Sequence, residues 1–238
     1  MMALNENRAA PSLTFHEPDW LEWLTTVLCT WFWIYPHPYK LVFTIVLTLP
    51  VFGLIYSGLS RPSLASLVSI SEQDGKNKYD LADFIEFPGI VILLRVVLDF
   101  EYESLYSILK VGAIGFIISL ILLGATHKLV EKSNKNKWII YLSVVGNIAL
   151  YSYAATYGIN CVYDTSKPKV YHAKVIRKSI SHGRNYLIHY LRVEPWGPNR
   201  ETEDIRVSAT QYNATDTGHT ISIDLKEGLL GIPWYYAE

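Results

Sequence analysis

The sequence predicts an α-helical membrane bundle followed by a small all-β C-terminal domain, an OB-like or SH3-like barrel or sandwich. Three observations predict this fold class. Residues 1–160 hold only 24 charged side chains, whereas the 78 residues 161–238 hold 19. Long uncharged stretches occur only in the first part, and the apolar period changes to two near residue 170. With 238 residues, 50% hydrophobic, and a net charge of -1, the chain fits neither a disordered protein nor a basic nucleic-acid binder.

Three apolar stretches are predicted to span a membrane, at about 41–59, 105–130 and 138–160. The first would reach about 28 Å as a helix, close to the ~30 Å hydrocarbon core of a bilayer. Pro50 lies near its middle, where neighbouring helices tolerate proline in a membrane. Lys110 near the start of the second stretch can extend its ammonium group toward water.

The N-terminal segment 1–40 contains a further predicted helix at 18–35, rich in tryptophan. Tryptophan favours membrane interfaces, so this helix either lies on the bilayer or forms a short span. Glu22, Thr25, Thr26 and Cys29 fall largely on its polar side. Its apolar face would contain Trp20, Leu24, Val27, Leu28, Trp31, Ile34 and Tyr35.

A helix at 81–100 has an apolar run too short to span alone, interrupted by Arg95. It could be re-entrant, interfacial, or a span shielded by other helices. Asp99 lies one helical turn after Arg95, which places the two charges side by side. The pair could form a polar site inside the bundle, but an ion pair that anchors the helix is the favoured interpretation.

Small residues share one face of the second apolar stretch, at Gly112, Gly115 and Ser119. Such a face lets two helices approach closely, and Asn147 in the third stretch could add an interhelical hydrogen bond. Packing within one chain is favoured, with homodimerisation or binding of another membrane protein as the alternative.

The β-domain is predicted at 164–238, after the last apolar stretch. Apolar and polar residues alternate in 171–177, 186–193, 205–209 and 221–225, with glycine- and proline-containing turns between them. A fifth short strand is expected at 229–234. The bend that precedes it would tuck Trp234 into an apolar site, either at the end of the barrel or at the membrane surface.

Lysine-rich loops between spans usually face the cytoplasm, and Lys128, Lys132, Lys135 and Lys137 form such a cluster. The predicted location is therefore the bacterial inner membrane, with the β-domain in the periplasm.

No catalytic, phosphate-binding or metal-binding motif occurs in the sequence, so we expect no enzyme activity, no metal and no cofactor. The two cysteines, Cys29 and Cys161, lie too far apart in the pattern to indicate a disulfide.

The segment from Val170 to Trp234 ends in Gly-Leu-Leu-Gly-Ile-Pro-Trp after a glycine-centred hairpin. It resembles small β-domains appended to multi-pass bacterial membrane proteins. The size and layout of the whole chain also resemble immunity proteins against pore-forming toxins, including colicin-like and type VI secretion toxins. That second resemblance implies a role in blocking a toxin and assigns no residue.

These observations predict a non-enzymatic membrane interaction protein, with an immunity protein that binds its toxin in or at the bilayer as the leading interpretation. A small transporter or channel component, or an envelope assembly factor acting through its β-domain, is the alternative. The expected partners are the bilayer and a protein toxin or another membrane protein, with no nucleic acid. The candidate partner-binding residues are Arg95, Asp99, Gly112, Gly115, Ser119, Asn147 and Trp234.

Overall fold

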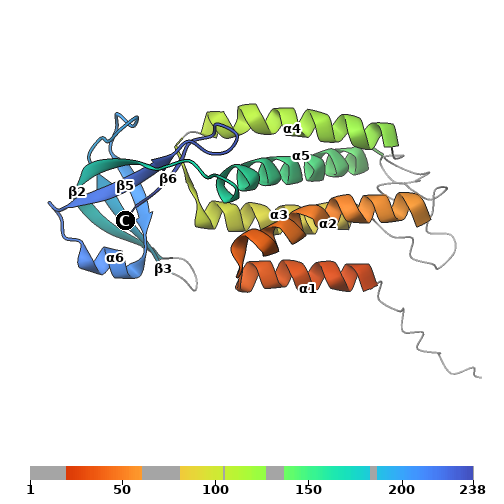
Figure 1. Cartoon of the computed structure of the whole chain (residues 1–238), viewed down its shortest axis with the longest axis horizontal. Helices are drawn as coiled ribbons and strands as arrows, with labels where there is room; N and C mark the ends of the chain where they lie inside the picture. The colour runs from red at the N-terminus through yellow and green to blue at the C-terminus, as the bar shows by residue number, and fades with distance from the viewer. Residues whose placement is uncertain (1–19, 61–80, 104, 127–136, 183–186, 238) are drawn as a thin grey trace, which may run out of the picture.

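The computed structural model describes residues 20–60, 81–103, 105–126, 137–182 and 187–237. Within these ranges, five long helices run side by side and meet an antiparallel sheet at one end (Figure 1). A sixth, short helix lies against the sheet. The helices are α1 (Trp20–Ile34), α2 (Tyr39–Ser60), α3 (Leu81–Asp99), α4 (Leu105–Thr126), α5 (Lys137–Val162) and α6 (Ala209–Ala214).

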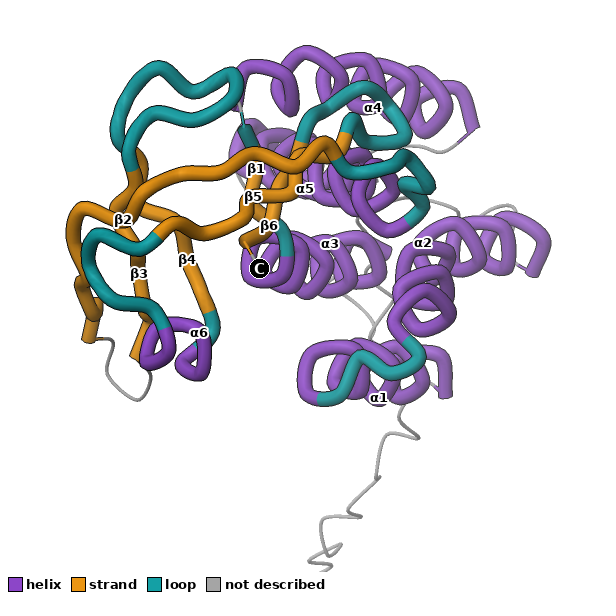
Figure 2. The backbone as a smooth tube through the Cα atoms, turned by 60° about the vertical axis from the view of Figure 1, so that its left-hand side comes forward, coloured by secondary structure: helices purple, strands orange, loops and turns teal. Residues whose placement is uncertain are grey.

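The helical unit has α3 and α5 at its centre, because these two helices pack most extensively on each other. α4 packs on α5, while α1 and α2 pack on each other and on α3. As a result, α4 and α1 lie at opposite edges of the unit in both views (Figures 1 and 2). Its apolar core contains fully buried side chains from four helices, among them Phe32, Phe43, Ile92 and Ala154.

The sheet takes one strand from the helical part of the chain. Its strand order is β1-β6-β5-β2-β3-β4, and every neighbouring pair is antiparallel. β1 lies between α3 and α4 and pairs with β6, with Glu101 opposite Tyr235 (Figure 2). The strands are β1 (Glu101–Tyr102), β2 (Lys169–His182), β3 (Leu187–Val193), β4 (Glu203–Val207), β5 (Thr220–Lys226) and β6 (Trp234–Ala237).

The sheet is curled, so that β4 at one edge comes close to β6 and β1 at the other. Tyr235 donates its hydroxyl hydrogen to Glu203 Oε1 over 2.8 Å, and Arg206 Nε lies 3.2 Å from Glu101 Oε1. Side chains, not a backbone ladder, therefore hold these two edges together. The apolar core inside the curl contains Ala173, Val175, Leu191, Val193, Trp196, Ile205, Ile221, Ile223 and Tyr235.

The prediction of a membrane-spanning bundle is wrong. Among the described residues, none of the helices combines the length and the apolar character needed to cross a bilayer. The expected spans at 41–59, 105–130 and 138–160 were chosen because they carry little or no charge, and scarcity of charge is a weaker property than sustained hydrophobicity. α5 shows the difference, since it has no charge after Lys137 but contains Asn147, Ser152, Thr156 and Asn160.

The predicted inner-membrane location and periplasmic β-domain depended on those spans, so this finding overturns them too. Lys128, Lys132 and Lys135 of the loop that set the orientation lie outside the described residues.

For the two shorter helices, the spanning alternative is wrong as well, because neither is, over its described residues, long and apolar enough to cross a bilayer. The helix expected at 18–35 corresponds to α1, which forms a hairpin with α2 through the turn at Tyr35–Pro38 and is covered by protein on one side. The helix expected at 81–100 corresponds to α3, whose Val91, Ile92 and Val96 are buried in the core of the helical unit. α3 therefore finds its apolar cover in neighbouring helices, whereas α1 is covered on one side only.

Candidate interaction surfaces and the helix–sheet junction

Arg95 and Asp99 form an ion pair within α3, with Arg95 Nε 2.8 Å from Asp99 Oδ2. Both side chains are about one quarter exposed, at the end of α3 next to the sheet. Tyr39 at the start of α2 lies near them: its burial raises the pKa of its hydroxyl, and the charge of Asp99 raises it further. The ion pair that the one-turn spacing predicted is therefore present, and both an anchoring role and a role in binding a partner stay predictions.

Gly112, Gly115 and Ser119 face α5 of the same chain. A Cβ atom at Gly112 would lie 2.1 Å from the ring of Tyr153, and one at Gly115 would lie 2.9 Å from Thr156 Oγ1. Ser152 donates its hydroxyl hydrogen to Ser119 over 3.2 Å. These residues thus hold α4 close to α5, and a role in binding a partner stays a prediction.

Asn147 makes its interhelical hydrogen bond to α3, a helix that the sequence did not suggest. Its Nδ2 donates to Glu86 Oε2 over 2.9 Å. Glu86 lies in the segment 81–100, for which no contact with Asn147 was predicted, so a carboxylate partner between two helices was missed. The pair joins the two helices at the centre of the unit.

Trp234 lies where the sheet meets the helices, at neither of the two sites expected for it. Its ring packs edge-on against Phe100 at the end of α3, with centroids 5.1 Å apart. Its Nε1 donates to Asp164 Oδ2 over 2.9 Å. Trp234 therefore belongs to the core of the helical unit, although it is part of β6.

Asn160, at the end of α5, is fully buried and binds the backbone of the loop before β6. Its Oδ1 accepts from the N–H groups of Leu230 at 2.9 Å and Ile232 at 3.3 Å, and its Nδ2 donates to the carbonyl of Ile232 at 2.8 Å. Gly228 in the same loop has φ +76°, and a Cβ there would lie 2.4 Å from Asn160 Oδ1. Only glycine fits this conformation and this close approach.

Asp164 is a charged residue where the helices meet the sheet, next to Trp234; we call this place the helix–sheet junction. Burial alone would raise the pKa of its carboxyl, but hydrogen bonds from Ser166 and Trp234 and the charge of Lys226 outweigh burial and lower it. Its Oδ2 also accepts from the N–H of Gly228 over 3.1 Å. The junction thus contains an ionised carboxylate that accepts hydrogen bonds from several donors.

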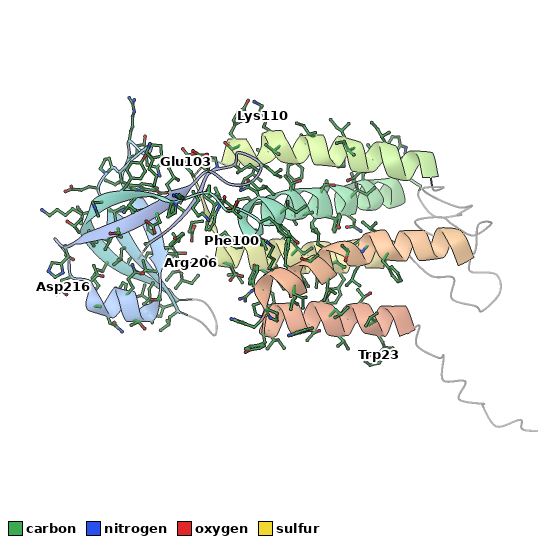
Figure 3. All side chains as sticks on the ribbon, in the orientation of Figure 1. Trp23, Phe100, Glu103, Lys110, Arg206 and Asp216 are labelled. Atoms are coloured by element: carbon green, nitrogen blue, oxygen red, sulfur yellow. The ribbon has the colours of Figure 1, made fainter. Side chains whose placement is uncertain are left out.

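Arg206 of β4 closes the junction on the other side. Its guanidinium donates to the carbonyl of Leu98 at the C-terminus of α3 and pairs with Glu101 (Figure 3). A cation is favourable there because the last carbonyls of a helix carry partial negative charge. Neither Asn160, Asp164 nor Arg206 was a predicted site residue, because the partners that join each of them to another element lie 62 or more positions away.

The outer face of α1 is apolar and uncovered. The buried side of this helix contains Thr25, Cys29 and Phe32. The more apolar side points away from the bundle, and Trp23 is seen there in Figure 3. We call Trp23, Leu24, Val27, Trp31 and Ile34 the α1 face; their exposed fractions run from 37% to 72%.

The outer face of α4 is also uncovered, on the side of the helix opposite Gly112 and Gly115. We call the exposed residues on this side of the helix the α4 face. It consists of Tyr106, Lys110, Ile114, Ile117, Ile118 and Ile121, and its five apolar members are 53% to 74% exposed.

Metal-ligating side chains do not cluster in the described part of the chain. No group of three or more histidine, cysteine, aspartate or glutamate residues is placed there to hold a metal ion. Cys29 and Cys161 are both buried and unpaired, and burial raises the pKa of each thiol to about 12. We take the exposed apolar α1 and α4 faces as the candidate functional surfaces.

Comparison with protein families, with curated proteins and with solved structures finds no match for this chain.

Proposed function

We propose that this chain is a non-enzymatic interaction protein that binds another protein through the α1 face. The observation that carries the proposal is the direction of α1, which buries Thr25, Cys29 and Phe32. The same helix exposes Trp23, Trp31 and Trp33. A helix that packed only for its own stability would bury its more apolar side, because each buried large apolar side chain contributes about 1.5–3 kcal/mol.

The composition of the α1 face supports a protein partner. Tryptophan is among the residues that contribute most binding energy at protein interfaces. At about 200 Å² for each fully exposed large side chain, the five residues expose about 500 Å² of surface. A patch of this size is at the upper end for a monomer and is typical of a binding site.

The spacing of the face indicates an α-helical partner. Leu24, Val27, Trp31 and Ile34 follow each other at intervals of three, four and three residues. This is the spacing by which one helix packs along another. The face has no charged member, so the partner helix would present an uncharged, apolar side.

The partner class comes from the sequence-based resemblance to immunity proteins, of which the chain length and the lack of a catalytic motif remain once the membrane bundle is set aside. On this proposal the partner is a protein toxin with an exposed apolar helix, and binding would block that helix. Arg95, Asn147 and the small residues of α4 would then support the fold and make no contact with the toxin.

A capture experiment tests the proposal. The tagged full chain is crosslinked in intact cells of its source, purified, and compared with Val27→Asp. Val170→Asp is the matched control, because Val170 is an equally exposed valine on the sheet. We expect one protein in near-stoichiometric amount, crosslinked to residues of α1, at least tenfold reduced by V27D and unchanged by V170D. A captured protein that V27D does not reduce, or recovery of lipid alone, would contradict the proposal.

A further inference from the structure

The α4 face is separate from the proposed partner site on α1, because the two helices lie at opposite edges of the helical unit (Figures 1 and 2). α4 packs on α5 through its small residues and has no described segment on its outer side. The apolar members of its outer face are three isoleucines at 114, 117 and 121, flanked by Tyr106 and Ile118.

We infer that the α4 face binds a second copy of this chain, with the two α4 helices packed antiparallel around a twofold axis. A twofold contact pairs one surface with itself, so a continuous apolar stripe becomes covered in both copies at once. The stripe Lys110, Ile114, Ile117 and Ile121 has intervals of four, three and four residues, which suits helix-to-helix packing along its length.

The charge on α4 sets the direction of the pair. Lys110 is the only charged residue in this helix. A parallel pair would bring two lysines together, whereas an antiparallel pair separates them at opposite ends. In the antiparallel pair, Ile114 meets Ile117 of the partner subunit, and Lys110 lies at the rim, where its ammonium group stays in water.

The exposed apolar area of the α4 face is large enough for a dimer interface. The five apolar residues of the α4 face expose about 600 Å² per chain, at about 200 Å² for each fully exposed large side chain. Two copies would therefore bury about 1,200 Å², the lower limit for specific and stable interfaces. Lys110 adds the aliphatic part of its side chain.

Cysteine crosslinking in intact cells tests the inference. Two differently tagged full-length chains are produced together, one with Ile114→Cys and one with Ile117→Cys, and oxidised mildly with diamide. The native thiols do not interfere, because Cys29 and Cys161 are buried. The matched control replaces I117C by Leu109→Cys, because Leu109 is similarly exposed on α4 but lies off the stripe.

We expect a mixed disulfide dimer of I114C and I117C, at least tenfold more abundant than with L109C. A second measurement places a photoreactive benzophenone at position 117, where we expect an adduct of two copies. Mixed dimers no more abundant than the control, or a benzophenone adduct with lipid or a different protein in place of the second copy, would overturn the inference. Val27→Asp is expected to leave the mixed dimer unchanged, so this result is independent of the test of α1.

Discussion

At the scale of single residues, buried polar side chains join the helices to the sheet. Asn160 alone makes three hydrogen bonds to the loop between β5 and β6, and it is completely shielded from water. A buried polar group is costly when its partners are lost, because the desolvation of the remaining groups is no longer offset. The junction is therefore sensitive to small changes in side-chain chemistry.

The substitution Asn160→Ala tests this sensitivity. It leaves the N–H and the carbonyl of Ile232 buried without their side-chain partner and removes the acceptor of the partly buried Leu230 N–H. We therefore expect a loss of about 2–4 kcal/mol in the free energy of unfolding. Urea unfolding followed by circular dichroism measures it. Asn213→Ala is the control, because Asn213 is exposed on α6 and should change stability by less than about 0.5 kcal/mol. Equal effects of the two substitutions would contradict this role of Asn160.

The carboxyl of Asp164 makes the junction dependent on pH. Its pKa in the folded chain lies below its ordinary value of 3.8, so the folded state prefers the ionised form. The stabilisation is fully present above that ordinary value and is lost as the pH falls through the lower, folded-state pKa. We expect Asp164→Asn to cost about 1–3 kcal/mol at pH 7, because hydrogen bonds to a charged group are strong ones.

The difference in unfolding free energy between the parent chain and Asp164→Asn should therefore shrink as the pH falls below 3.8. Unfolding curves at several pH values measure it. A difference that stays constant down to pH 3 would show that the charge of Asp164 does not contribute.

At the scale of elements, two glycines in the helices should respond in opposite ways to the same substitution. A methyl group at Gly112 would overlap the ring of Tyr153, whereas one at Gly146 would meet no atom within 4 Å. We expect Gly112→Ala to lower the free energy of unfolding by about 1–3 kcal/mol, because it forces α4 and α5 apart. Gly146→Ala should raise it by about 0.5–1 kcal/mol, because alanine favours the helix. Thermal unfolding measures the stability of both variants, and a loss of stability in both would contradict the packing described for α4.

Several elements could be predicted from the sequence pattern. The four alternating stretches correspond to strands β2 to β5, and the face of Gly112, Gly115 and Ser119 indicated a close helix contact, which α5 makes. The direction of α1 could not be predicted, because the pattern shows which side of a helix is more apolar and not which side is covered. β1 was missed because a two-residue strand has no period, and its pairing with β6 joins residues more than 130 positions apart.

The candidate site was predictable only in part, for the same reason of distance along the chain. Arg95 and Asp99 are one turn apart, so their ion pair followed from local spacing. Asn147 was expected to bond another helix, but Glu86 as its acceptor depends on how α3 and α5 align. Trp234 was expected in an apolar site, and its contact with Phe100 depends on the docking of the sheet onto α3.

At the scale of the whole molecule, one apolar core connects helices far apart in the sequence. Cys29 of α1 and Cys161 of α5 both belong to that core and are at most 4% exposed. We expect neither thiol to react with a maleimide at pH 7 in the folded chain, because burial excludes the reagent and raises each pKa to about 12. Mass spectrometry should find two modified thiols after unfolding in urea. Rapid modification of Cys29 alone in the folded chain would show that α1 does not pack as described.

The central claim is that the outer side of α1 is a protein-binding surface. The most direct measurement is photo-crosslinking in intact source cells, with a benzophenone residue placed at each position from 23 to 34 in turn. The account predicts adducts with one protein at Trp23, Val27, Trp31 and Ile34, and none at Thr25 or Cys29, which face the bundle. Adducts with lipid only, or protein adducts that do not follow this helical period, would contradict it.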